Sequence, residues 1–128
     1  MSETLRVNVA GTVALTRAAA QHFIARGDGG AIVNVASIEA LQPAAGHSHY
    51  AASKAAVIMH ARAAALELGP HGIRVNVVAP GLIDRAGLAD AWPDGVGRWL
   101  AACPLERLGT TDDVADAVLF LLSNARCV

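Results

Sequence analysis

The 128-residue sequence is poor in cysteine, in aromatic residues and in charge. Its two cysteines, Cys103 and Cys127, are too few for a disulfide framework, and neither has a histidine or cysteine neighbour at metal-ligand spacing. We therefore expect two buried free thiols and no metal site. With 16% charged residues and a net charge of -1, the composition excludes a disordered chain and excludes nucleic-acid binding by charge.

Long apolar runs are missing as well. No stretch of about 18 residues is free of polar interruption, so we expect no membrane span and no membrane partner. The N-terminus lacks the basic-then-apolar pattern of a signal peptide, which makes a cytoplasmic protein the default. The chain is instead rich in small apolar residues, within a hydrophobic content of 54%, as is typical of buried helices. At this length we expect a single domain over residues 1–128.

The apolar pattern predicts helices alternating with strands. Helical spacing predicts one helix over Glu3–Arg26 and another, apolar nearly all round and buried on more than one side, over Tyr50–Leu68. Short runs rich in β-branched residues predict buried parallel strands over Ala31–Ala36 and Ile73–Ala79. Strand, helix and strand in this order form a right-handed βαβ crossover, so the expected fold class is α/β.

The pattern is looser between residues 82 and 103. Turns are expected around Pro93-Asp94-Gly95, followed by a short amphipathic helix over Val96–Ala102. Trp92 and Trp99 lie here, and two interpretations stay open for them. They wall an apolar substrate pocket, or they pack the short helix onto the body of the protein.

A last helix is expected to run to Ser123. Thr111 is predicted as its N-cap because a hydroxyl there can accept a hydrogen bond from a backbone N–H of the first turn. Asp112 and Asp113 then lie in that first turn, where negative charge is favoured by the helix dipole.

Tyr50 and Lys54 are the candidate functional pair. They are the only tyrosine and the only lysine, and their spacing of four places both side chains on one face of a helix. Random placement would give this offset only about one time in a hundred. The histidines His47, His49 and His60 are assigned to loop and helix surface, because no carboxylate accompanies them in the sequence.

Five separated signatures resemble the short-chain dehydrogenase/reductase family in its order and spacing. The matching segments are Asn8-Val9-Ala10-Gly11, Ile32-Val33-Asn34-Val35-Ala36-Ser37, Tyr50-Ala51-Ala52-Ser53-Lys54, Gly72-Ile73-Arg74-Val75-Asn76 with Pro80-Gly81, and Arg107-Leu108-Gly109 before Asp112-Asp113-Val114-Ala115. The resemblance implies a partial Rossmann-like, doubly wound parallel sheet, truncated at both ends. It also implies reversible hydride transfer between NAD or NADP and a small-molecule carbonyl or secondary alcohol.

The resemblance assigns four catalytic residues. Tyr50 would be the general acid/base, Ser37 would hold the substrate oxygen, Lys54 would bind the nicotinamide ribose and favour the phenolate, and Asn8 would anchor a water that relays protons to Lys54. From the residues alone, two simpler interpretations remain: Ser37 ends a strand, and Asn8 belongs to the polar face of a helix.

Cofactor contacts are implied for Tyr50 and Lys54 and, after the second strand, for Pro80, Gly81 and Ile83. Many relatives carry a threonine soon after that point, where this chain has Arg85. The glycine-rich phosphate loop of the family must follow a strand and open a helix. The glycines at 27–30 follow a helix and precede a strand, so they are not that loop.

Most of the nucleotide-binding half of the family pattern is therefore absent from the sequence. A two-stranded parallel sheet with open edges is not stable alone, so we expect a homodimer or homotetramer formed through helices 3–26 and 50–68. Three hypotheses follow: an NAD(P)-dependent oxidoreductase, a truncated and inactive relative that serves as an oligomerisation or interaction module, or an unrelated α/β binding protein.

Overall fold

Two parallel strands form the centre of the computed structural model, which describes residues 2–123. Strand β1 (Gly30–Val35) pairs with β2 (Ile73–Val78) in register from Gly30 opposite Ile73 to Val35 opposite Val78. Helix α3 (Ser48–Leu68) connects them and begins two residues before the predicted start at Tyr50. The predicted βαβ crossover and the α/β class are confirmed.

The N-terminal helix is continuous from Ser2 to Arg26, as predicted, but it is not uniformly α-helical. Helix α1 (Ser2–Leu5) passes into a π-helical turn (Arg6–Ala10) and then into α2 (Gly11–Arg26). Gly27 ends α2 with a φ of 78°, in the left-handed region that glycine adopts most readily. The apolar pattern of the sequence does not reveal the π turn, because the turn changes the width of the helix and not the types of residue in it.

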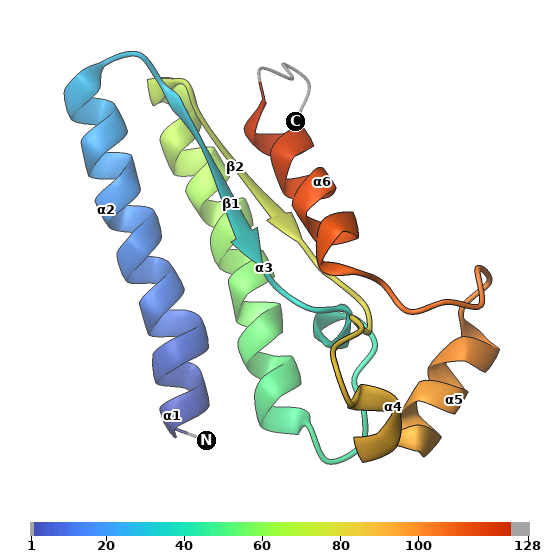
Figure 1. Ribbon diagram of the computed structural model, residues 1–128. Helices are drawn as coiled ribbons and strands as arrows, with labels where there is room; N and C mark the ends of the chain where they lie inside the picture. Colours follow the sequence, from blue (N-terminus) through green and yellow to red (C-terminus); the bar gives the residue numbers. More distant parts are fainter. Residues whose placement is uncertain (1, 124–128) are drawn as a thin grey trace.

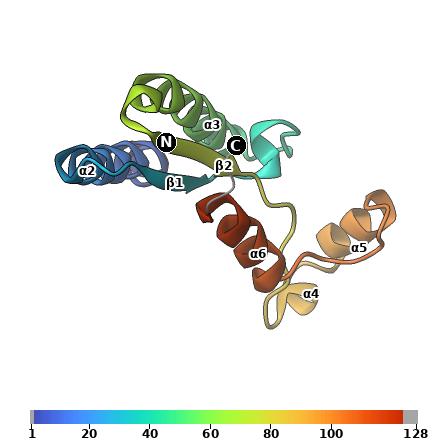
Figure 2. The ribbon, with the colours of Figure 1, turned by 90° about the horizontal axis from the view of Figure 1, so that it is seen from above.

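Helices cover both faces of the sheet, as in a doubly wound fold. Figures 1 and 2 show α3 on one face, α6 (Thr111–Leu122) on the opposite face, and α2 alongside β1. On the α3 face, Ala61 and Ala64 pack against Ile73 and Val75 and leave each of these side chains 7% exposed or less. The small alanine side chains allow the helix to lie close to the sheet.

Helix α3 packs against the sheet and against the N-terminal helix, as the prediction of burial on more than one side requires, but part of its surface stays open in this single chain. Met59 is 60% exposed and Leu66 is 83% exposed on the helix face away from the sheet. On the other side of the sheet, the Arg74 guanidinium donates to the backbone carbonyls of Leu121 and Ser123 at 2.7 and 2.6 Å and so fixes the end of α6. These carbonyls belong to the last helical turn, where intrahelical partners run out.

Residues 79–110 leave the sheet and return, an excursion that carries α4 (Leu88–Ala91) and α5 (Pro93–Ala102) away from the body (Figure 1). The predicted turn at Pro93-Asp94-Gly95 is wrong, because these residues form the first turn of α5. Proline is favoured there, since its missing N–H would have no helical partner anyway. Two short 3₁₀ turns, Ile38–Ala40 and Gly69–His71, complete the elements of the described chain.

The N-cap of α6 is Thr110 and not the predicted Thr111. Thr110 has extended backbone angles, and its hydroxyl accepts from the N–H of Asp113 at 3.1 Å. The Asp113 carboxylate accepts from the backbone N–H of Thr110 at 2.8 Å, which completes a reciprocal capping box. None of the helices in residues 2–123 is long and apolar enough to cross a membrane.

Candidate active site

Tyr50 and Lys54 lie one turn apart in the first half of α3, as their spacing predicts. The Lys54 ammonium is 5.7 Å from the centroid of the Tyr50 ring and donates to the backbone carbonyl of Val35 at 3.0 Å. Val35 is the last residue of β1, two positions before Ser37. The structure therefore brings the single tyrosine and the single lysine to the strand end that leads into Ser37.

Lys54 is half-buried, and burial lowers the pKa of its ammonium from the ordinary value. Desolvation has this direction because it penalises the charged form. The Val35 carbonyl accounts for one of the three N–H donors of the ammonium. The remaining donors give Lys54 the capacity to hold hydroxyl groups of a ligand at this place.

Ser37 lies at the start of the loop after β1 with an extended backbone, at φ -162° and ψ 154°. Its hydroxyl oxygen accepts from the backbone N–H of Glu39 at 3.2 Å and so caps the 3₁₀ turn Ile38–Ala40. As an acceptor in this contact, the hydroxyl keeps its proton for another partner. Ser37 thus ends a strand, and its side chain remains able to donate.

Asn8 lies in the π turn, where backbone geometry departs from the α-helix. Its side-chain amide donates to the hydroxyl of Ser53 at 3.0 Å, and that hydroxyl donates to the backbone carbonyl of Tyr50 at 2.7 Å. Ser53 is fully buried. Asn8 is therefore more than part of a polar helix face, because it is connected to the turn of α3 that holds Tyr50 and Lys54.

Ser53 was missed as a site residue by the sequence analysis. The only available signal was its place between Tyr50 and Lys54 in the segment Tyr-Ala-Ala-Ser-Lys. A helical serine usually faces solvent or bonds to its own backbone, so this position alone does not indicate a cross-helix link.

The loops after the two strands are joined to each other. The N–H of Ile38 donates to the carbonyl of Pro80 at 2.9 Å, which connects the residue after Ser37 to the Pro80-Gly81 segment. Further on, Ile83 and Gly109 form an isolated parallel bridge. Ser37 and the residues implied in cofactor binding therefore lie at one edge of the sheet, the edge where α/β folds place their ligands.

An open cavity of about 290 Å³ adjoins this edge. Its walls come from the residues after β2, from α5, from the segment that links α5 to α6, and from the start of α6. They include Pro80, Gly81, Ile83, Trp99, Cys103, Leu105, Leu108 and Val114. The walls are mostly apolar. All three of the predicted cofactor contacts past the second strand line it.

The two tryptophans behave differently: Trp99 lines the cavity and also packs α5 against Gly81, whereas Trp92 does neither. Trp99 lines the cavity, and a Cβ built on Gly81 would lie 2.6 Å from the Cζ2 atom of its ring. Trp92 packs its ring against Gly95 of α5 and is 43% exposed. Trp99 therefore walls an apolar cavity, while Trp92 packs within the short helical segment.

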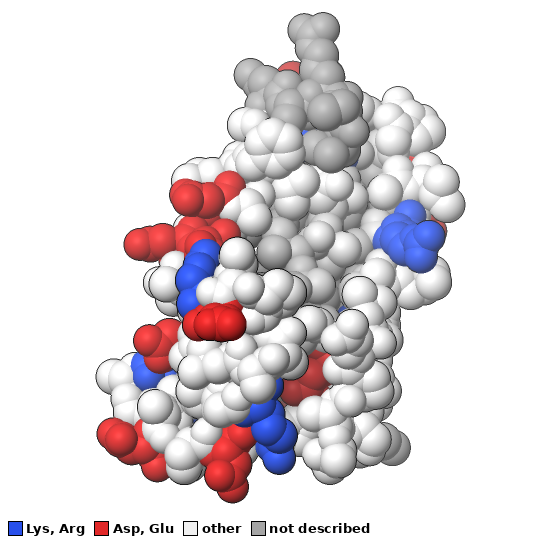
Figure 3. Space-filling view, turned by 90° about the vertical axis from the view of Figure 1, so that its right-hand side faces the viewer, with Lys and Arg blue, Asp and Glu red and all other residues white. Residues whose placement is uncertain are grey.

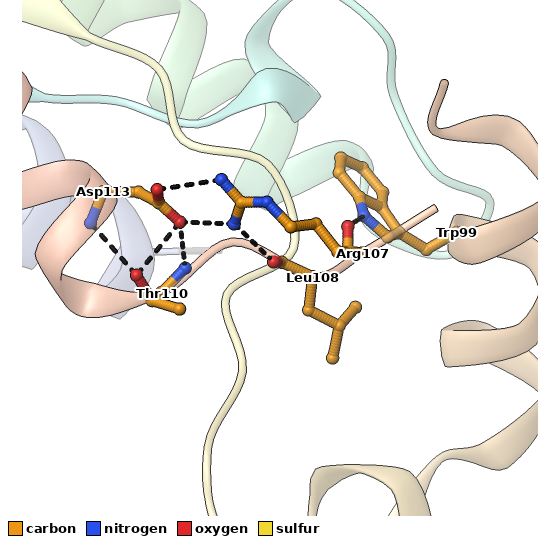
Figure 4. Close-up of polar contacts among 5 residues, drawn as sticks. All are labelled: Trp99, Arg107, Leu108, Thr110 and Asp113. Carbon is orange, nitrogen blue, oxygen red and sulfur yellow. Dashed lines mark hydrogen bonds and ion pairs between the residues drawn. The ribbon is translucent and has the colours of Figure 1, made fainter. Parts of the chain in front are cut away.

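The far side of the cavity is held by a polar cluster at the start of α6 (Figure 4). The Arg107 guanidinium forms a bidentate ion pair with Asp113 at 2.6 and 2.9 Å, and the Trp99 indole N–H donates to the Arg107 carbonyl at 3.2 Å. Arg107 and the hydrogen bonds from Thr110 hold the pKa of the Asp113 carboxyl well below its ordinary range. The cluster connects the cavity wall at Trp99 to the N-terminus of α6.

Two expectations about histidine and cysteine are wrong in part. A carboxylate does accompany His47, because Nδ1 of the ring lies 3.0 Å from an oxygen of Glu39, eight residues earlier. His60 is half-buried on α3, and its Nε2 atom is buried with no hydrogen-bond partner among the described residues. Cys103 is free but half-buried, and Cys127 lies outside the described residues.

The described residues contain no group of three or more His, Cys, Asp or Glu side chains that could hold a metal ion. Figure 3 shows acidic and basic side chains interspersed over one face, without a large patch of either sign.

Comparison with known proteins agrees with this geometry. The family described as "Enoyl-(Acyl carrier protein) reductase" matches residues 1–128. The L-xylulose reductase of Caenorhabditis elegans is 40% identical over 126 residues, covering 97% of this chain and 50% of the relative. The chain spans about half the length of the curated relatives it matches.

Solved structures give the same result. A short-chain type dehydrogenase/reductase from Mycobacterium ulcerans superposes with a TM-score of 0.88 at 36% identity, covering 97% of this chain and 46% of the other. ElxO with NADP bound superposes with a TM-score of 0.83 at 34% identity, covering 93% and 49%. The two-stranded sheet with its helices is thus part of a Rossmann-like fold, and the chain belongs to the short-chain dehydrogenase/reductase family.

Proposed function

We propose that this chain carries the proton-transfer residues of an NAD(P)-dependent oxidoreductase that interconverts a carbonyl and a secondary alcohol. Family membership supports the oxidoreductase class and removes the hypothesis of an unrelated binding protein. The observation that carries the proposal is the position of Lys54, which lies beside the Tyr50 ring and is hydrogen-bonded to the end of β1 just before Ser37.

Tyr50 would act as the general acid/base at its phenolic oxygen, and Ser37 would donate a hydrogen bond to the substrate oxygen. The effect of Lys54 on charge that develops at the phenolic oxygen depends on the surroundings, because two unit charges attract each other about four times more strongly at an effective dielectric near 20 than in bulk water. The pair therefore works best when a bound ligand closes the half-exposed site. Asn8, anchored through Ser53, would hold the water that returns a proton to Lys54.

The nicotinamide end of the cofactor fits this site in part. Lys54 has N–H donors for ribose hydroxyls, and the cavity lined by Pro80, Gly81 and Ile83 is near the lower limit for a small-molecule site. Bound there, NAD(P)(H) would supply or accept the hydride. The adenine end has no glycine-rich strand-to-helix loop among the described residues, since residues 27–30 precede β1. Binding by this chain alone is therefore the first property to measure.

Titration of the purified chain with NADH and NADPH, followed by fluorescence or calorimetry, tests the proposal. Saturable binding of either cofactor, together with turnover of a panel of ketones and aldehydes, is expected. Tyr50→Phe should then abolish turnover and leave cofactor affinity nearly unchanged, because it removes only the hydroxyl. Turnover that survives in Tyr50→Phe contradicts the assignment of the acid/base.

A second function is favoured by a different observation, the exposed apolar faces of the long helices. Leu5, Val9 and Val13 line an open groove along the N-terminal helix, and Met59 and Leu66 are exposed on α3. Such surfaces mark interaction sites. The chain would then act as an oligomerisation module, as a homodimer or homotetramer through helices 3–26 and 50–68.

Cofactor titration and sedimentation separate the two functions. An oligomer with no saturable binding at millimolar NADH or NADPH places the isolated chain in the second class. A stable monomer in sedimentation velocity contradicts the oligomer in either case. Both functions fit the cytoplasmic location that the sequence predicts.

A further inference from the structure

Glu39 and His47 form a contact that spans the loop between the two hydroxyl-bearing residues of the proposed site. The Nδ1 atom of His47 lies 3.1 and 3.0 Å from the two carboxylate oxygens of Glu39. Glu39 comes two residues after Ser37, and His47 comes three residues before Tyr50. The contact therefore joins the two ends of the loop at the positions nearest the proposed catalytic residues.

On the serine side, the connection is direct. The backbone N–H of Glu39 donates to the Ser37 hydroxyl oxygen at 3.2 Å, which uses one lone pair and limits the orientations open to the hydroxyl. The Glu39 side chain is 21% exposed, so it is held more firmly than an ordinary surface carboxylate. Movement of Glu39 would change the direction in which Ser37 donates.

On the tyrosine side, His47 is both the residue that starts the helix and a neighbour of the phenol ring. Its backbone carbonyl accepts the first helical hydrogen bond, from the N–H of Ala51 at 2.9 Å. Its imidazole ring meets the Tyr50 ring edge-on, with centroids 6.5 Å apart and an interplanar angle of 78°. This is a favourable aromatic arrangement, so the position of the imidazole restricts that of the phenol.

Between these two residues the loop has little else to fix it. Residues 41–49 are all exposed, and Leu41 is 71% exposed. The loop includes two alanines and Gly46, which has a φ of 82°. Backbone turns such as the one from His47 to Ala44 give it local shape. The 3₁₀ turn Ile38–Ala40 also packs against α3, so the side-chain contact acts together with this packing to join the two ends of the loop.

We propose that Glu39 and His47 are positioning residues, a side-chain strap that sets the orientation of the Ser37 hydroxyl relative to the Tyr50 phenol. The inference rests on the proposed function, since the two hydroxyls matter together only if they bind one substrate oxygen. The strap forms a path from Ser37 through Glu39 and His47 to Tyr50 that bypasses the sheet. It would hold the pair in a reactive arrangement before substrate binds, which lowers the cost of reaching that arrangement.

The single tyrosine makes a direct test possible. Incorporation of 3-fluorotyrosine places one ¹⁹F nucleus in the protein, on the Tyr50 ring. In His47→Ala the ¹⁹F signal should shift and narrow because the ring loses its edge-on neighbour. Glu39→Ala should cause a similar change because the imidazole loses its anchor, and the double variant should add little to His47→Ala.

Matched controls are available in the chain. His49→Ala removes an exposed imidazole two residues away, and Glu67→Gln neutralises an exposed carboxylate on α3. Both should leave the ¹⁹F signal unchanged.

A ¹⁹F signal that changes in His47→Ala but not in Glu39→Ala overturns the strap, because the Glu39 side chain would then not hold the ring. Equal changes in His49→Ala overturn it as well. The ¹⁹F result does not depend on cofactor binding, so failure of the proposed function in the NADH and NADPH titrations is a separate outcome. If the wild type turns over a ketone, Glu39→Ala should lower kcat about tenfold and leave the KM for cofactor unchanged.

Discussion

The sheet with its three long helices and the excursion of residues 79–110 are held together in different ways. Most buried apolar side chains belong to the sheet and to α2 and α3, including Val57, Ile73 and Val75, whereas the excursion contributes Leu88 and Val96. Figure 2 shows α4 and α5 lying away from the sheet and its covering helices. The proposed proton-transfer residues lie on the well-packed part, and most of the cavity wall lies on the other. Such a division lets a substrate pocket vary without disturbing the chemistry.

Truncation of the core is the strongest test of this difference. Ile73→Ala should cost about 3 kcal/mol of unfolding free energy, because Ile73 is 2% exposed and its neighbours on α3 cannot collapse into the space. Leu88→Ala should leave the global transition nearly unchanged, because the excursion opens on its own.

Urea unfolding measures both effects. Both tryptophans lie in the excursion, so their fluorescence reports on that part, while circular dichroism reports on all the helices. Two distinct transitions in the wild type are expected. Coincident fluorescence and dichroism curves in every variant would show that the chain unfolds as one cooperative unit. That result would contradict the difference in stability between the sheet with its helices and residues 79–110.

Loss of the Ser53 hydroxyl should have the next largest effect. Ser53→Ala leaves the Asn8 amide without its partner and should cost roughly 2 kcal/mol. Hydrogen exchange should then increase in the π turn and in the first turns of α3, and the amides of α6 should stay protected. Ser53→Thr retains the hydroxyl and is the matched control. Equal destabilisation by both variants would point to a general intolerance of substitution at this fully buried position and not to the hydrogen bond.

A smaller effect is expected where the two regions meet at Gly81. The Cβ of Gly81→Ala would lie 2.6 Å from the Cζ2 atom of the Trp99 ring and should displace the ring into the cavity. In a Trp92→Phe background, the emission of Trp99 should shift to longer wavelength as the indole becomes more exposed. Gly97→Ala in α5 has open space around its Cβ and should instead stabilise that helix by about 0.5–1 kcal/mol. An unchanged Trp99 spectrum in Gly81→Ala contradicts this packing.

The smallest effect is local and depends on pH. Because the pKa of Asp113 is lowered in the folded state, its ion pair and capping bonds stabilise the start of α6 at neutral pH. They should be lost as the pH falls below about 4, toward the lowered folded value. The chemical shift of the backbone amide at position 113, followed by nuclear magnetic resonance, should change over this pH range in the wild type and not in Asp113→Asn. Asp112→Asn, next to it in the chain, should behave like the wild type.

Sequence patterns predicted those parts of the fold that depend on local periodicity. Tyr50 and Lys54 were found by spacing because a helix repeats within five residues, and both strands were found from their β-branched runs. The π turn was not predictable, since its geometry accompanies a packing contact between Asn8 and Ser53, 45 residues apart. The start of α5 could have been predicted from Pro93, had proline been read as a first helical residue.

The Glu39–His47 contact shows a different limit. Its members lie in a 3₁₀ turn and just before α3, so no periodic spacing relates them, and the contact depends on how the loop closes. The sequence prediction placed the N-cap of α6 at Thr111, one residue too late. Two threonines are adjacent here, and only the backbone angles decide which of them is the cap. Which residue types are near the site was predictable, but which atoms meet was not.

The π turn at Arg6–Ala10 has a consequence for how this sequence can change. A π turn accommodates one more residue than an α-helical turn would. Deleting one of its five residues would let this stretch become a regular α-helix, while the residues before and after it keep their present faces. The contact from Asn8 to Ser53 would change, because Asn8 lies within the turn. A single-residue deletion should therefore be tolerated better here than in a regular part of the helix, where it would rotate everything before it by about 100° relative to α3.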